Sequence, residues 1–129
     1  MNEQELAEAW IRRYEVVQTH GDQSNEARAT FDGFEMFNAA VQDEPERAWA
    51  AMLIALELTN NEFVLENLAA GPLENLLVKH GGAFIDRVEV QASNERFRWL
   101  LKGVWGERVA STIWTRIEQI LDQQDDRRE

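Results

Sequence analysis

Four side chains in the middle of the sequence could support acid–base chemistry or hold a metal ion. They are Glu66, Glu74, His80 and Asp86. Carboxylates and imidazoles are the groups that metal-dependent hydrolases use. On one predicted helix, however, Glu74 and His80 would lie about 120° apart around the axis and about 9 Å apart along it. Because this spacing is poor for sharing one ion and the chain has no cysteine, we predict no metal. The sequence has no glycine-rich phosphate-binding motif and no serine in a nucleophile motif, so we also predict no other cofactor and no catalytic residue. An enzyme or metal-dependent hydrolase using these four residues is the alternative.

The segment around Glu74 has a structural explanation. Pro72 suits the first turn of a helix, where its missing N–H costs no hydrogen bond. Glu74 would then meet the free N–H groups and the positive dipole at that helix start. His80 would lie in the last turn, before a glycine cap at Gly81. We therefore interpret the segment as a structural motif formed by Gly71, Pro72, Leu73, Glu74 and His80.

Two short segments resemble a known family. Residues 69–77 carry an A-A-G-P-L-E-x-L-L motif, and residues 103–105 are Gly-Val-Trp. With these motifs, residues 49–105 resemble an uncharacterised bacterial family of small helical domains, a domain of unknown function. The resemblance implies no assigned activity and thus no catalytic residues.

One tryptophan is a candidate for binding a partner. Of the five tryptophans, most lie on predicted core stripes, but Trp99 points away from the apolar side of its helix, near Arg96 and Lys102. Tryptophan and arginine dominate the binding energy of interfaces. The alternative is that Trp99 packs between two layers of helices, with Gly103 allowing a close approach.

The charge of the chain is strongly acidic and uneven. Residues 1–66 hold 14 acidic and 4 basic residues, whereas residues 67–129 hold 10 and 9, within a total net charge of -11. Nucleic-acid binding needs a basic footprint, so we predict no nucleic-acid partner. Glu8 and Glu15 should face water on the first helix, where they could steer a basic protein toward the chain.

These observations favour a non-enzymatic, acidic protein-interaction module. An immunity-type or antitoxin-type protein, which masks a basic toxin, is the most specific version. A self-associating structural subunit is a further alternative. The chain has no cysteine, its N-terminus is acidic and its longest apolar stretch, residues 48–58, is shorter than the roughly 20 residues that span a bilayer. We therefore expect a cytoplasmic protein that does not enter membranes.

The elements that must position these residues are helices. Apolar residues recur at helical spacing in residues 6–17, 31–41, 97–104 and 109–120. The stretch 49–58 is apolar all round, which indicates a helix at the centre of the fold. Helix starts are predicted at Asn2, Asp43, Thr59 and Ser93, and helix ends at Gly21, Gly71 and Gly81.

We expect an all-α fold of about seven short-to-medium helices. They should form one compact domain over residues 1–121, followed by a charged, frayed tail at 122–129. The short helices between residues 60 and 104 are compatible with an irregular, helical-repeat-like array.

Overall fold

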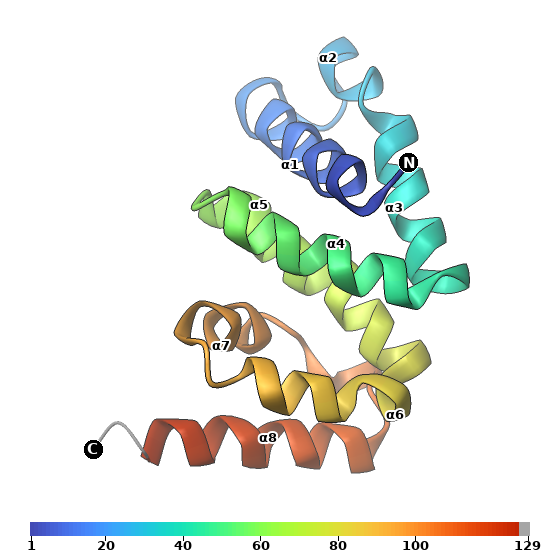
Figure 1. Ribbon diagram of the computed structural model, residues 1–129. Helices are drawn as coiled ribbons and strands as arrows, with labels where there is room; N and C mark the ends of the chain where they lie inside the picture. Colours follow the sequence, from blue (N-terminus) through green and yellow to red (C-terminus); the bar gives the residue numbers. More distant parts are fainter. Residues whose placement is uncertain (127–129) are drawn as a thin grey trace.

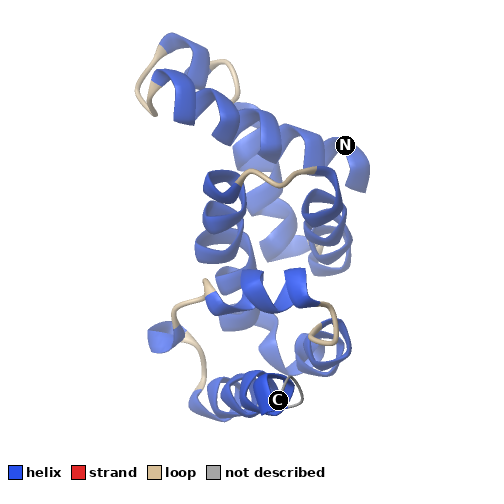
Figure 2. Ribbon diagram, turned by 90° about the vertical axis from the view of Figure 1, so that its left-hand side faces the viewer, coloured by secondary structure: helices blue, strands red, loops and turns tan. Residues whose placement is uncertain are grey.

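Eight α-helices and two short helical turns build residues 1–126, the part of the chain that this computed structural model describes, and no strand occurs among them. In chain order they are α1 (Glu3–His20), α2 (Asn25–Arg28), α3 (Phe31–Asp43), α4 (Pro45–Leu58), α5 (Glu62–Leu68), the π turn η1 (Ala69–Leu73), α6 (Glu74–Gln91), α7 (Glu95–Lys102), the 3-10 turn η2 (Gly106–Arg108) and α8 (Ser111–Asp126). The helices stack from α1 and α2 at one end to α8 at the other (Figure 1), and the view turned by 90° shows helices joined by loops (Figure 2). Because α2 is only a single turn, seven longer α-helices remain among the described residues. This confirms the predicted all-α fold of about seven helices.

The first helix follows the sequence-based prediction closely. The Asn2 side chain accepts a hydrogen bond from the backbone N–H of Glu5 at 2.8 Å, and the Glu5 carboxylate accepts one from the N–H of Asn2 at 3.1 Å. Leu6 and Trp10 are buried on its inner side. The helix ends at Gly21, whose φ of 89° suits glycine.

Other predicted caps are wrong by one or two residues. Asn61, not Thr59, caps α5, because its side-chain oxygen reaches the N–H of Phe63 at 3.0 Å. Thr59 instead accepts a hydrogen bond from the N–H of Asn61, which fixes the turn before the helix. Asn94 likewise replaces Ser93 as the cap of α7.

The Asp43 cap is also wrong, since Asp43 is the last residue of α3 and α4 has no side-chain cap. Pro45 does begin α4, as predicted. This helix lies between the N-terminal and C-terminal layers (Figure 1), and its side chains from Ala48 to Leu56 are mostly buried. Leu58, at its end, is exposed.

The predicted helix boundary at Gly71 and Pro72 is absent. The chain passes from α5 through the π turn η1 into α6 without a break. Pro72 lacks an N–H and would crowd the carbonyl one turn earlier in a regular helix. The wider π turn at this position accommodates its ring.

The predicted helix end at Gly81 is also wrong. The helix only kinks at His80, where φ is -127° and ψ is 17°, and then continues to Gln91. Gly81 has a packing role instead: a β-carbon there would lie 3.1 Å from a side-chain carbon of Ile113 in α8.

The last helix continues past the predicted domain boundary at residue 121, to Asp126. The rest of the expected tail, residues 127–129, lies outside the described residues. Within the described residues, no helix combines the length and the apolar character that crossing a membrane requires.

Candidate partner-binding site

Glu74 has a structural role, but not the one predicted. Instead of stabilising a helix start, its buried carboxylate links α6 to the segment after α7. It accepts a hydrogen bond from the backbone N–H of Trp105 at 3.0 Å and from the Arg108 guanidinium at 2.7 Å. The two segments that carry the family resemblance therefore meet in space.

The other candidate acid–base residues are not gathered around Glu74. His80 hydrogen-bonds through Nε2 with the carbonyl oxygen of Val41, at 3.1 Å. Asp86 accepts a hydrogen bond from Arg116 at 3.0 Å on the surface, and Glu66 is exposed. Among the side chains that the structure describes, no three His, Asp or Glu are placed so that they could hold one metal ion.

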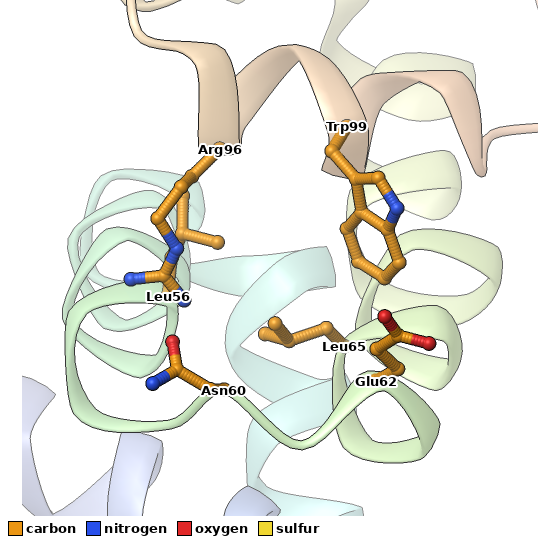
Figure 3. Close-up of a pocket in the computed structure, with 6 residues that line it drawn as sticks. All are labelled: Leu56, Asn60, Glu62, Leu65, Arg96 and Trp99. Carbon is orange, nitrogen blue, oxygen red and sulfur yellow. The ribbon is translucent and has the colours of Figure 1, made fainter.

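A groove of about 280 Å³ lies between α7 and the junction of α4 with α5. It is lined by Leu56, Asn60, Glu62, Leu65, Arg96 and Trp99. Trp99 faces Arg96 across the groove, and Glu62 lies on the side of Trp99 (Figure 3). The two leucines are buried and form its apolar lining. The structure thus brings together Arg96 and Trp99, two of the residues predicted to bind a partner.

The position of Trp99 follows from the pattern of α7. Phe97, Leu100 and Leu101 are buried on the inner side of this helix, which leaves Trp99 41% exposed. Trp99 is therefore not enclosed between two layers. The predicted close approach at Gly103 does occur, because a β-carbon there would lie 2.9 Å from that of Ala69.

Arg96 and Lys102 flank Trp99 on α7, and both are exposed. Arg96 donates a hydrogen bond to the carbonyl oxygen of Thr59 at 2.8 Å. This bond holds its guanidinium against the end of α4, where the helix dipole is negative.

Trp105 is a second exposed tryptophan that the sequence analysis did not single out. It is 68% exposed and lies beside Ala70 and Glu74 in a neighbouring hollow. Trp99 shares its groove with Glu62 and Leu65 of α5, and Trp105 shares its hollow with Ala70 of η1, so the two tryptophans lie beside successive parts of the α5–η1 segment. The predicted helical stripe of residues 97–104 ends one residue before Trp105, and no local spacing sets this tryptophan apart.

Three exposed carboxylates lie on α5 and beside Trp105. Glu62 and Glu66 lie one turn apart on α5, and Glu107 lies beside Trp105; all three are exposed. These three form no ion pair with any side chain of residues 1–124. We call this surface the tryptophan face and define it by Glu62, Leu65, Glu66, Ala70, Trp99, Trp105 and Glu107.

The predicted steering residues lie elsewhere. Glu8 and Glu15 are exposed on α1, and the Glu8 carboxylate accepts a hydrogen bond from Gln4 at 2.9 Å. The structure therefore has exposed acidic residues on α1 as well as on the tryptophan face.

Comparison with known proteins yields one match. Residues 19–125 match a family described as "Family of unknown function (DUF6869)". Neither a curated protein nor a solved structure matches the chain.

Proposed function

The chain belongs to this family of unknown function, and we propose that it is a non-enzymatic interaction module that binds a basic protein. One observation carries the proposal. All 14 acidic residues of positions 1–66 are described, every one except Glu3 is exposed, and only Glu44 and Glu46 form ion pairs with described residues. Such a surface attracts a positively charged partner and raises the rate of association.

An immunity-type or antitoxin-type role is the most specific form of this proposal. A protein of this kind masks a basic toxin by contact alone and needs no catalytic group. The hydrolase alternative loses support because Glu74 and His80 each have a structural hydrogen-bond partner. Since the chain has no cysteine, we place the encounter in the cytoplasm, where reducing conditions prevail.

The test begins with capture of the partner from the native host, followed by surface-based binding kinetics. We expect a basic partner whose association slows as salt rises, because salt screens exposed charges with a Debye length of about 8 Å at physiological ionic strength. The variant Glu8→Lys with Glu15→Lys should slow association and leave dissociation nearly unchanged.

A matched control changes the same charge at the other end of the molecule. Glu118→Lys with Asp122→Lys alters two exposed acids of α8 and should slow association less than the α1 variant does. An acidic partner, or an association rate that does not respond to salt, would contradict the proposal.

A further inference from the structure

Building on the proposed function, we infer that the tryptophan face is where the partner is held, and that its occupant is a protein segment bearing lysine or arginine side chains. The acids of α1 act on the encounter at a distance, whereas this face makes the lasting contacts. The two surfaces therefore have separable kinetic roles.

The groove beside Trp99 has the size and lining for one long cationic side chain. Its volume of about 280 Å³ is at the lower limit of the roughly 300–1,000 Å³ of pockets that enclose small-molecule ligands. The buried Leu56 and Leu65 offer apolar surface to the methylene groups of lysine or arginine. Trp99 offers a ring face to the cation, and Glu62 adds a carboxylate on the same side (Figure 3).

The charges on the face select the sign of the ligand. Glu62, Glu66 and Glu107 form no ion pair with any described residue. By contrast, Arg96 donates to a backbone carbonyl and Arg108 to Glu74. Arg96 keeps its positive charge, because a carbonyl oxygen does not neutralise it, but the hydrogen bond holds its guanidinium at Thr59, on the side of the groove away from Trp99 and Glu62 (Figure 3). The three carboxylates outnumber it and favour a cation beside Trp99.

Trp105 provides a second contact further along the same flank. Glu62, Glu66 and Ala70 follow one another at intervals of four residues, and Ala70 lines the hollow beside Trp105. The rise from residue 62 to residue 70 is about 12 Å. A segment with two cations spaced by two or three helical turns can therefore reach both rings.

Glu74 prepares this second contact in advance. Its hydrogen bond to the N–H of Trp105 fixes the backbone that carries the exposed ring, so less conformational freedom is lost on binding. A second copy of the chain is a poor occupant, because a net charge of -11 on each copy makes them repel.

The experiment uses the full chain and two synthetic amphipathic peptides of about 15 residues, one built from lysine and leucine and the other from glutamate and leucine. The indole and backbone N–H signals of the protein are followed by NMR during titration. We expect the lysine peptide to shift the signals of Trp99 and Trp105 to saturation and to leave that of the buried Trp10 unchanged. The glutamate peptide should shift none of them.

Affinity is then compared in variants with matched controls. Trp105→Ala, at a largely exposed position, should raise Kd roughly two- to fivefold, the range for one exposed cation–π contact. Phe31→Ala, which removes an aromatic ring of similar exposure to Trp99 at the start of α3, should leave Kd unchanged. Glu62→Gln with Glu66→Gln should speed dissociation, whereas Glu8→Gln with Glu15→Gln should mainly slow association.

Three results would overturn the inference. Signal changes centred on α1, or equal loss of affinity in the two glutamine variants, would leave the proposed function standing and remove the tryptophan face from it. A dimer that Trp99→Ala dissociates would assign the face to a second copy. Absence of binding to the lysine peptide at low salt would remove both the face and the preference for basic ligands.

Discussion

Replacing Glu74 should destabilise the fold far more than replacing an ordinary surface glutamate would. Glu74 is only 8% exposed and accepts from the N–H of Trp105 and from Arg108. A hydrogen bond to a charged group contributes about 1.5–3 kcal/mol. Because the Arg108 side chain is 60% exposed, its ion pair adds at most about 1 kcal/mol. We therefore expect Glu74→Ala to lower the free energy of unfolding by about 2–4 kcal/mol.

The assay is urea unfolding of the wild type, Glu74→Ala, Arg108→Ala and the double variant. Arg108→Ala should cost about 1 kcal/mol or less, and the coupling between the two changes should be of the same size. Amide hydrogen exchange at Trp105 should become faster in Glu74→Ala and in the double variant, but not in Arg108→Ala. A loss of only about 0.3–1 kcal/mol in that variant would match a helix-end interaction and refute the role assigned to the hydrogen bond with Trp105.

The remaining predictions concern packing and ionisation. Gly103→Ala should destabilise the fold by about 1–3 kcal/mol, because the new β-carbon would press on Ala69. Gly82→Ala should instead stabilise the fold by about 0.5–1 kcal/mol, because nothing lies within 4 Å of the new β-carbon. Equal effects of the two changes in urea unfolding would contradict this contrast. Burial raises the pKa of Tyr14 above its ordinary value of 10.0. Since Tyr14 is the one tyrosine of the chain, an absorbance titration should show a midpoint above 10, and the stability of the fold should fall as the pH rises through that midpoint. A midpoint at or below 10 would count against the burial of Tyr14. The hydrogen bond from Arg87 holds the pKa of Glu46 below its ordinary value of 4.5. The ion pair of Arg87 with Glu46 therefore stabilises the fold above pH 4.5 and ceases to do so as the pH falls through the lowered pKa. The difference in Tm between the wild type and Glu46→Gln should vanish in acid. A Tm difference that persists there would refute the stabilising role of this pair.

Local signals in the sequence predict most of the helices but not all of their ends. Asn2 and Gly21 bound α1 as expected, because the capping interactions at each end involve only nearby backbone groups. Gly81 was misinterpreted because its reason for being small is Ile113, more than thirty positions away. Pro72 was misinterpreted because one π turn lets a helix pass a proline.

The candidate site was predictable only in part. The spacing on α7 indicated that Trp99 leaves the core, and the structure places it beside Arg96. Trp105 was missed because its exposure depends on where Glu74 holds the backbone, a long-range contact that no local spacing reveals.

The unpaired carboxylates of residues 1–66 also act on one another. Crowded like charges repel within the folded chain and favour its expansion. Moderate salt should therefore make the isolated protein more resistant to heat even as it slows the encounter with a partner. A basic partner would relieve the same repulsion by neutralising these groups, and it would add the stabilisation that any ligand specific for the folded state provides. The bound protein should accordingly outlast the free one under heat or proteolysis, which would make its abundance in a cell depend on how much partner is present.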